Sequence, residues 1–389
     1  TGYSVQEGKR MKEIYADCAS TTPISEPALR VMTECMRTCY GNPSSSHHCG
    51  REAARVLEEA RDGIAACIGA DREEIYFTSG GTEADNQAIF TAAAYGKAMG
   101  KHHMIFSSIE HHAVLNCIPA LKKAGFEITQ IGVDPWGRVS MEELKAACRQ
   151  DTILVAVMYV NNEVGTIEPI AEIGQLCRER NILLHVDGVA AAGHLPVHVK
   201  ELGAGMFSLS AHKFRGPRGI GALYVDKKIP VANMMFGGSQ ERTKRPGTQN
   251  VPGAAAMAQA LCDSVATLEE QTQKLERLRK RLLDGLQDVE GMWLNGHLES
   301  RIPGIVNLGF EDVSGETLML LLDLKGIAVS TGAACNTHSV EPSHVLTAMG
   351  LTKERAGSCI RISFSADHTE EDIDQICGIL KQEVARARQ

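Results

Sequence analysis

The sequence predicts an α/β protein whose larger part is a mainly parallel, seven-stranded sheet covered by helices on both faces. Seven short apolar segments between residues 74 and 225 alternate with segments of helical periodicity, which is the pattern of βαβ units. After residue 250 the alternation stops, and a long charged helical pattern leads into a shorter mixture of strands and helices. We therefore expect a second, smaller α+β part.

Each predicted strand of the large sheet is a short apolar segment next to a polar turn. The seven strands are expected over Glu74–Thr78, Met104–Ser107, Glu127–Ile131, Ile153–Tyr159, Ile182–Asp187, Met206–Ser210 and Ala222–Val225. Helical periodicity between them covers Val114–Ala124, Met141–Arg149 and Ile170–Arg180. Because ligands of such sheets bind at the carboxyl ends of the strands, the functional residues are sought there.

The smaller part is expected to begin with one long helix, Ala254–Gly291. Its other elements are strands over Gly304–Leu308, Ala328–Ser330 and Ile360–Ser363 and a closing helix over Glu370–Arg388. We predict one unit of residues 24–263 and a second of residues 11–23 plus 264–389. Residues 1–10 are polar, and we expect them to be an expression remnant ahead of a natural start at Met11.

Bulk composition excludes several classes of protein. The 389 residues suit two domains, and 43% hydrophobic with 23% charged residues is typical of a soluble globular protein. A net charge of −8 argues against binding nucleic acid, and no apolar run approaches the roughly 20 residues that span a membrane. Twelve scattered cysteines without a CxxC pair indicate reduced thiols in the cytoplasm.

A lysine follows the predicted strand Met206–Ser210. Hydroxyl groups and the imidazole of His212 precede Lys213, and a turn with Gly216 and Pro217 comes after it. A lysine held there can form a Schiff base with an aldehyde while its neighbours hold a phosphate. This combination indicates pyridoxal 5′-phosphate, whose ring is an electron sink that no side chain supplies.

A glycine-rich turn follows the first predicted strand of the sheet. The run Thr78–Glu83 reads TSGGTE and opens a helix. Free N–H groups at a helix N-terminus, next to glycines that let the backbone approach closely, form a phosphate cradle. The alternative is a tight turn in which Thr82 only caps the helix.

A carboxylate ends the predicted strand Ile182–Asp187, 26 positions before Lys213 (213 minus 187). A carboxylate beside a pyridine nitrogen keeps that nitrogen protonated and the ring electron-poor. An aspartate at a strand end is more often a cap. One helix-length segment and one strand separate Asp187 from Lys213, so both residues can lie at one sheet edge.

Two adjacent histidines, His111 and His112, follow another predicted strand. An imidazole can stack on a cofactor ring and move protons, although most histidines do neither. Asn162 lies in a polar turn that it could simply help to build. Arg361 lies in an apolar strand, where it would either grip a substrate carboxylate or form a structural ion pair.

One cysteine lies in a loop without hydrophobic periodicity, Ser330–Ser339. Cys335 is surrounded there by small and polar residues, so it is the best candidate for an exposed, reactive thiol. The alternative is a loop cysteine of no consequence.

Taken together, these segments resemble the cysteine desulfurases of the NifS/IscS type, within the class V aminotransferases and fold-type I of the pyridoxal-phosphate enzymes. The resemblance runs from about Ile14 to the C-terminal helix. Besides TSGGTE it rests on YAD, TTP, GNPSS, EHHAVL, NNEVGT, HVDG, SAHKF, GGSQER, RPGTQN and EPSHVL.

The resemblance implies a role for each matching residue. The cofactor would be held by Lys213, Asp187, His111, Gly81, Thr82, Asn162, Ser210, His212 and, from the partner subunit of a homodimer, Thr248. Asn162 and Arg361 would grip the substrate carboxylate. Lys213 would move protons at the substrate α-carbon, His111 would stack on the ring, and Cys335 would take the sulfur as a persulfide.

The implied reaction converts L-cysteine to L-alanine in the cytoplasm and passes sulfur to an acceptor protein, for iron–sulfur cluster assembly or a thio-cofactor, without a metal ion. A selenocysteine lyase or another β-lyase would share nearly the whole site. A catalytically weakened scaffold protein is an alternative of another class, and a class V aminotransferase would not require Cys335.

Four residues depart from the family pattern. Ala190 replaces the usual glutamine, which donates a hydrogen bond to the phenolic oxygen of the cofactor. The others are Cys18 for asparagine, Arg215 after the SAHKF segment and Gln249 for glutamate. We expect the change at position 190 to open space beside the ring and to alter either the substrate range or the activity.

Overall fold

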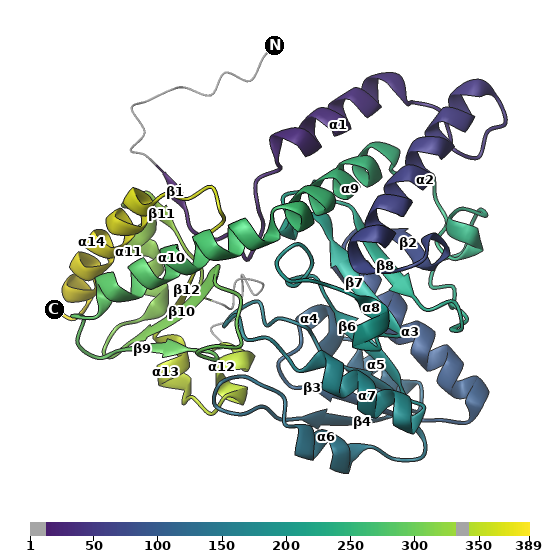
Figure 1. Cartoon of the computed structure of the whole chain (residues 1–389). Coiled ribbons are helices and arrows are strands. Elements are labelled where there is room, and N and C mark those ends of the chain that lie inside the picture. The colour runs from purple at the N-terminus through teal and green to yellow at the C-terminus, as the bar shows by residue number, and fades with distance from the viewer. Residues whose placement is uncertain (1–12, 332–341) are drawn as a thin grey trace.

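The computed structural model describes residues 13–331 and 342–389 (Figure 1). Its largest element is a seven-stranded sheet in the order β2-β8-β7-β6-β5-β3-β4. The strands are β2 (Ile75–Thr78), β3 (His103–Ser107), β4 (Glu127–Ile131), β5 (Thr152–Ala156), β6 (Leu183–Asp187), β7 (Met206–Ser210) and β8 (Gly221–Val225). Only β8 is antiparallel to its neighbours, so the predicted mainly parallel sheet is confirmed.

Strand β5 is shorter than the predicted Ile153–Tyr159. It ends at Ala156, because the N–H group of Met158 donates to the buried carboxyl of Glu110 (2.7 Å) instead of to a neighbouring strand. The chain then turns toward Asn162 at the carboxyl edge of the sheet. A side chain far away in the sequence therefore set the end of this strand.

Helices cover both faces of the sheet (Figure 1). They are α1 (Glu26–Thr38), α2 (His48–Ile68), α3 (Gly81–Met99), α4 (His112–Leu115), α5 (Ile118–Lys123), α6 (Met141–Ala147), α7 (Ile170–Arg180), α8 (Val199–Leu202) and α9 (Val251–Ala266). The prediction of one helix over Val114–Ala124 was wrong. Two short helices stand there, and Pro119 lies in the first turn of α5, where its missing N–H group is tolerated.

The single long helix predicted over Ala254–Gly291 is also two helices. Helix α9 ends at Thr267, whose hydroxyl donates to the carbonyl of Asp263 (2.8 Å), and α10 (Leu268–Leu286) begins directly after it. Helix α9 packs against α1 and α2, whereas α10 packs against α14 (Glu370–Ala387). The two helices serve different parts of the molecule.

The second part contains a three-stranded antiparallel sheet. Its order is β12-β10-β9, with β9 (Met292–Asn295), β10 (Ile305–Phe310) and β12 (Cys359–Ser363). Strands β1 (Ile14–Tyr15) and β11 (Ile327–Ala328) form a short parallel pair. Three more helices complete this part: α11 (Gly315–Asp323), α12 (His344–Ala348) and α13 (Lys353–Gly357). The sequence did not predict β1 and β9.

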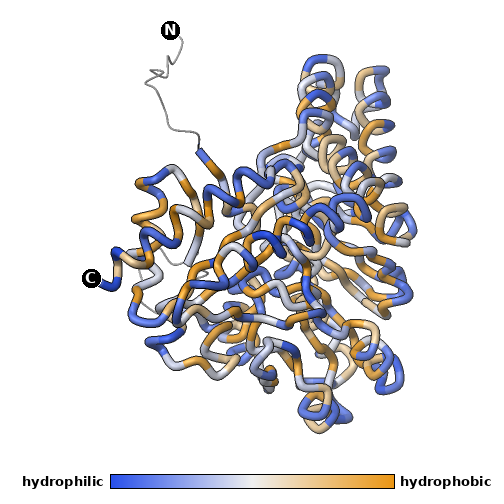
Figure 2. Tube along the Cα trace, turned by 60° about the vertical axis from the view of Figure 1, so that its left-hand side comes forward, coloured by the Kyte–Doolittle hydropathy of each residue, from blue (hydrophilic) through white to orange (hydrophobic). Residues whose placement is uncertain are grey.

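Hydrophobic and polar residues alternate along the outer helices, as the hydropathy colouring of the trace shows (Figure 2). One hydrophobic cluster joins α10, α14 and the three-stranded sheet, and it is separate from the clusters beneath α2, α3 and α9. We keep the division near residue 263 as a proposal. No helix within the described ranges is long and apolar enough to cross a membrane.

Candidate active site

A cavity of about 210 Å³ lies at the carboxyl edge of the large sheet. Strands β3, β5, β6 and β7 all end at this edge because they run parallel, and β2 points the same way. The cavity is lined by Ser20, Gly81, Thr82, Asp85, His111, Met158, Asn162, Asp187, Val189, Ala190, Ser210, His212 and Lys213. Eight of the residues expected from the sequence to hold a cofactor therefore meet in one place.

Lys213 lies just beyond the end of β7, in a short 3-10 turn, Ala211–Lys213. Its ammonium group donates to the carbonyls of Ala19 (2.5 Å) and Ser20 (3.0 Å). The backbone carbonyl of Lys213 accepts a hydrogen bond from the imidazole of His194 (3.0 Å). Burial lowers the pKa of His194, which favours the neutral imidazole. The lysine is thus fixed at its backbone while its amine reaches across the cavity.

One end of the cavity is suited to an anion. Helix α3 begins at Gly81, and the residue before it, Gly80, has no side chain that could cap the free N–H groups of the helix. Ser210 and His212 line the same end. Burial lowers the pKa of His212 to about 4, and its Nδ1 contacts the hydroxyl of Thr21 (3.1 Å). Helix N–H groups and neutral polar side chains of this kind can hold a phosphate.

Two buried carboxyl groups, those of Asp85 and Asp187, line the same cavity. Asp187 is 4% exposed and accepts from the N–H group of Val189 (2.9 Å). The pKa of Asp187 is raised to about 6, mainly by burial and to a smaller extent by the nearby Asp85. Burial raises the pKa of Asp85 to about 7. Its Oδ1 makes no hydrogen bond within the described residues, although Nε2 of the buried His185 lies 3.4 Å away. A cationic N–H group in the cavity would relieve both carboxyl groups.

The structure separates the two adjacent histidines. His111 lines the cavity, and its Nδ1 accepts from the N–H group of Ala113 (3.1 Å), so a neutral ring carries its proton on Nε2. His112 instead lies against His344, with ring centroids 4.8 Å apart. The geometry therefore favours His111 as the ring that stacks on a cofactor, a choice that the residues alone left open.

Arg361 lies at the rim of the site on β12 and is 2% exposed. Its guanidinium group donates to the carbonyl of Asn162 (2.9 Å), to the carboxylate of Asp17 (2.8 Å) and to the hydroxyl of Ser20 (2.5 Å). The structural ion pair considered from the sequence is therefore present. Its buried Nε has no partner among the described residues. Arg361 itself does not line the cavity, but its partners Ser20 and Asn162 do, so the arginine lies directly behind the cavity wall.

Arg361 and Thr248 were expected at the site but do not line this cavity. Thr248 is exposed. Cys335 lies outside the described residues, but both flanks of its loop are anchored near the site. Ser330 pairs with Arg361 through the backbone (3.1 Å), and the hydroxyl of Ser343 donates to the buried carboxyl of Glu163 (2.5 Å).

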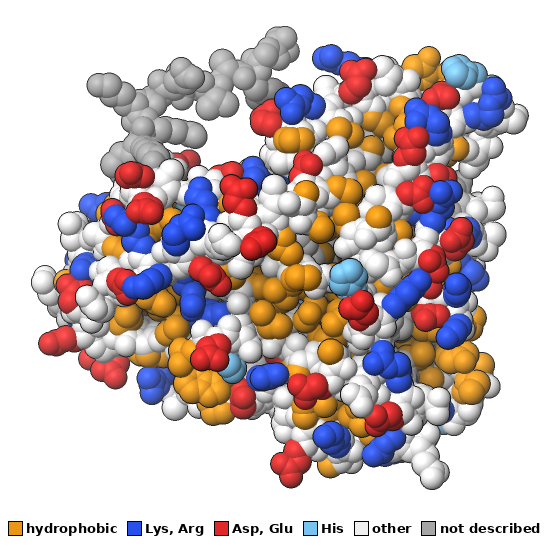
Figure 3. Space-filling view, viewed as in Figure 1, with side chains coloured by type: hydrophobic (Ala, Val, Ile, Leu, Met, Phe, Trp, Pro, Cys, Tyr) orange, Lys and Arg blue, Asp and Glu red, His pale blue; other side chains and the backbone are white. Residues whose placement is uncertain are grey.

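A second cavity, of about 60 Å³, adjoins the first and shares Asn162, Ala190 and Lys213 with it. Apolar side chains form most of its wall, including Phe214, Leu268, Leu275, Ile302 and Phe364. In the space-filling view, hydrophobic side chains gather at the centre of the face between the two parts of the molecule (Figure 3).

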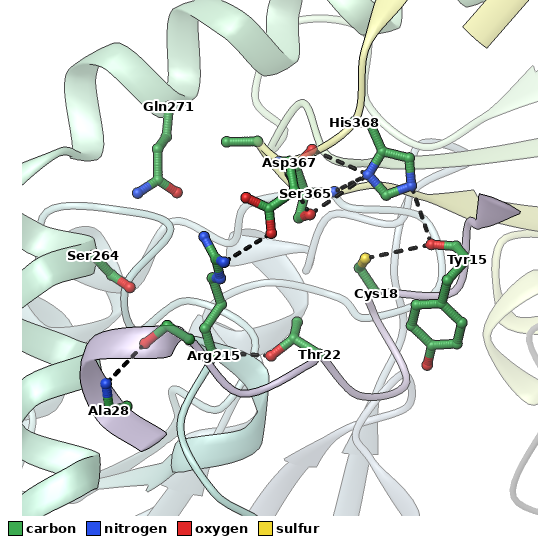
Figure 4. A network of polar contacts seen from close by, with 12 residues as sticks. Tyr15, Cys18, Thr22, Ala28, Arg215, Ser264, Gln271, Ser365, Asp367 and His368 are labelled. Atoms are coloured by element: carbon green, nitrogen blue, oxygen red, sulfur yellow. Dashed lines mark hydrogen bonds and ion pairs between the residues drawn. The ribbon is translucent and has the colours of Figure 1, made fainter. Parts of the chain in front are cut away.

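Three of the four residues that depart from the family pattern line this second cavity: Cys18, Ala190 and Arg215. Arg215 has a left-handed backbone (φ 66°), and its N–H group donates to the hydroxyl of Thr22 (2.9 Å). Its guanidinium group pairs with Asp367 (2.8 Å) (Figure 4). The departures are therefore concentrated beside the reaction site.

Sequence reasoning missed several residues of the main cavity. Ser20 lies in an irregular segment between β1 and α1, for which no periodicity predicts a place in the site. Asp85 follows Thr82 by three positions on α3, so helical spacing could have placed both on one face. Met158 and Val189 are apolar, and nothing in the sequence separates them from core residues.

The cavity fits pyridoxal 5′-phosphate. Asp187 and the α3 end provide a carboxylate and an anion cradle, and Met158, Val189 and Ala190 provide apolar walls for a ring between them. Asp85 lies buried beside Asp187 with the 3.4 Å contact to the neutral His185 imidazole at its Oδ1, and a protonated ring nitrogen would compensate such a pair of carboxyl groups. Lys213 supplies the amine that an aldehyde needs.

Comparisons with known proteins agree with this arrangement. The profile of the family "aminotransferase class-V" matches residues 14–376. The chain is 45% identical over 377 residues to a protein named cysteine desulfurase IscS from Methanosarcina thermophila, covering 97% of this chain and 93% of that protein. It is 43% identical over 378 residues to a protein of the same name from Dictyoglomus turgidum, covering 97% and 96%.

The fold is similarly close to solved structures. A structure described as a NifS-like protein superposes with a TM-score of 0.90 at 37% identity, covering 96% of this chain and 100% of that chain. DndA from Streptomyces lividans superposes with a TM-score of 0.77 at 37% identity, covering 90% and 99%. Both similarities extend over the large sheet and the smaller part together.

Proposed function

The chain belongs to the aminotransferase class-V family, and we propose that within it the chain is a cysteine desulfurase that converts L-cysteine to L-alanine and captures the sulfur as a persulfide on Cys335. Its cofactor is pyridoxal 5′-phosphate. The observation that carries the proposal is the meeting of Lys213, Asp187 and the α3 N-terminus in one cavity.

The cavity residues divide the work of the reaction. When bound, pyridoxal phosphate supplies a ring that stores the negative charge left on the substrate α-carbon. Asp187 would keep the ring nitrogen protonated, and Thr82, Ser210 and His212 would hold the phosphate. His111 would stack on the ring, and its Nδ1 accepts from the N–H group of Ala113, which leaves the proton of a neutral imidazole on Nε2.

Lys213 and Arg361 act on the substrate. The Lys213 amine, now held by the carbonyls of Ala19 and Ser20, takes the proton from the α-carbon. Arg361 and Asn162 hold the substrate carboxylate, with the unpartnered Nε of Arg361 as a donor. The Cys335 thiolate then attacks the substrate sulfur, so that an S–S bond forms and the carbon–sulfur bond breaks.

We further propose that the protein works as a cytoplasmic homodimer and hands its sulfur to an acceptor protein. Each cysteine within the described residues carries a free thiol, as in a reducing compartment. Thr248 is exposed, and the family resemblance gives it a place at the phosphate of the partner subunit.

The function is tested by measuring alanine formation from L-cysteine and from L-selenocysteine with the wild type and the Cys335→Ala variant. The proposal predicts that alanine formation from cysteine is lost in the variant although the protein keeps its cofactor absorbance. If the variant retains activity with selenocysteine only, and the wild type prefers that substrate, the protein is a selenocysteine lyase instead. If neither substrate yields alanine, the proposal is wrong.

A further inference from the structure

Two thiols outside the active site lie in direct contact. The sulfur atoms of Cys67 and Cys262 are 3.3 Å apart, and neither residue lines either cavity. Cys67 lies near the end of α2 and Cys262 lies on α9, 195 positions later in the chain (262 minus 67). Two thiols so distant in sequence are brought together only by the folded structure.

Small residues allow the two helices to approach closely here. Helices α2 and α9 pack along each other beneath α1 (Figure 1). A side chain at Gly63 would lie 3.5 Å from the Cys262 sulfur and 3.6 Å from Ala258. Because glycine and alanine face each other at this crossing, the thiols meet without a large side chain between them.

The contact is close to the geometry of a disulfide. An S–S bond is about 2.05 Å long, so the two sulfur atoms must approach by roughly 1.2 Å. Side-chain rotation can supply much of this movement. Both cysteines are partly exposed, so a small oxidant can reach them.

We propose that Cys67 and Cys262 are an oxidative modification site, in which a hydroperoxide converts the two thiols into a reversible disulfide between α2 and α9. The Cys262 thiolate attacks the peroxide, whose O–O bond breaks, giving a sulfenic acid and an alcohol. The Cys67 sulfur then attacks the Cys262 sulfur and displaces water. In total the two thiols lose two electrons, and one hydroperoxide gains them and is reduced to an alcohol and water.

The environment favours Cys262 as the first sulfur to react. The contact between the two sulfur atoms lowers the pKa of Cys262, while the same contact and burial raise the pKa of Cys67. The thiolate is the reactive form. Cys177, one of the buried cysteines among the described residues, has its pKa raised to about 12 by burial and should react slowly.

The test is peroxide treatment of the holoenzyme followed by peptide mapping without reduction. With tert-butyl hydroperoxide, the expected main cross-link joins the peptides of Cys67 and Cys262, and dithiothreitol removes it. A lack of this cross-link overturns the proposal. So does an equal yield of a cross-link between Cys35 and Cys39, which lie one helical turn apart at the end of α1. Sulfinic acid at Cys262 with Cys67 left reduced would overturn it as well.

Variants separate the pair from general oxidation. Cys67→Ser should abolish the cross-link, and Cys148→Ser, a matched change at another partly exposed cysteine, should keep it. Oxidation should raise the melting temperature of the wild type by a few degrees and leave that of Cys67→Ser unchanged, because a cross-link over a long loop restricts the unfolded chain. Equal shifts in both proteins would contradict the assignment.

Discussion

The two cavities that meet at Lys213 differ in what their walls can do. The larger one brings together carboxyl, imidazole, hydroxyl and free N–H groups at the carboxyl edge of the large sheet. The smaller one is walled mostly by apolar side chains contributed by α10 and by residues 302–305. The comparison shows that the titratable and hydrogen-bonding groups gather in the first cavity, and we propose that the second affects which molecule fits beside it.

The largest expected effect is at the shared lysine. Lys213→Ala removes both the cofactor linkage and the group that takes the α-proton. Alanine formation from cysteine should fall by about 10³-fold or more. The exposed Lys228→Ala is the matched control and should retain wild-type activity. A Lys213→Ala variant with more than a tenth of wild-type turnover would contradict the role of this residue.

The next effect concerns Arg361, which is both an ion-pair partner and a proposed substrate contact. Arg361→Lys keeps the charge but not the planar donor group, so KM for cysteine should rise by about 10- to 100-fold. The melting temperature should fall as well, because the contacts to Asp17 and Ser20 weaken. If stability falls but KM stays at the wild-type value, the arginine has only the structural role.

A third test uses pH and the buried carboxyl of Asp85. Its folded-state pKa of about 7 lies above the value of about 3.9 expected in the unfolded chain, so the folded state binds more protons between these values. Stability of the cofactor-free protein therefore falls as pH rises through this range. Below this pH range the carboxyl of Asp85 is protonated in both the folded and the unfolded state, so it no longer destabilises the folded protein.

Asp85→Asn removes this destabilising effect. The variant should have a higher free energy of unfolding than the wild type at pH 8. At pH 5 this difference should be smaller by on the order of 3 kcal/mol. Denaturant unfolding of both proteins at the two pH values measures this difference, with the exposed Asp284→Asn as control. A gain independent of pH would show that Asp85 does not titrate in this way.

The smallest effect is expected at Ala190, on the boundary between the cavities. Ala190→Gln should shift the visible absorbance of the bound cofactor, or the pKa of that absorbance, and change KM by less than about tenfold. Ala190→Leu fills similar space without a hydrogen-bond donor, so it separates volume from hydrogen bonding. Unchanged spectra and titrations in Ala190→Gln would mean that position 190 does not contact the cofactor.

Much of the large sheet could be predicted because its signal is local. Strands β4 and β7 and helix α7 have the predicted bounds, since each is a continuous periodic segment next to a clear turn. The parallel order then placed Asp187, Ser210 and Lys213 at one edge without further information.

The features that the sequence did not predict depend on contacts between segments that are distant in the chain. The end of β5 is set by Glu110, and the break before α10 by a hydrogen bond of Thr267. The choice between His111 and His112 needed the position of His344. The second cavity is formed by the N-terminal segment, α10 and two loops, so no local pattern in the sequence predicts it.

The central claim is that Lys213 binds pyridoxal phosphate, and reduction with borohydride followed by peptide mapping tests it most directly. The account predicts a yellow protein that is bleached by the reductant and carries one phosphopyridoxyl group on the peptide containing Lys213. A colourless protein that takes up no added pyridoxal phosphate, or a label on a different lysine, would contradict it.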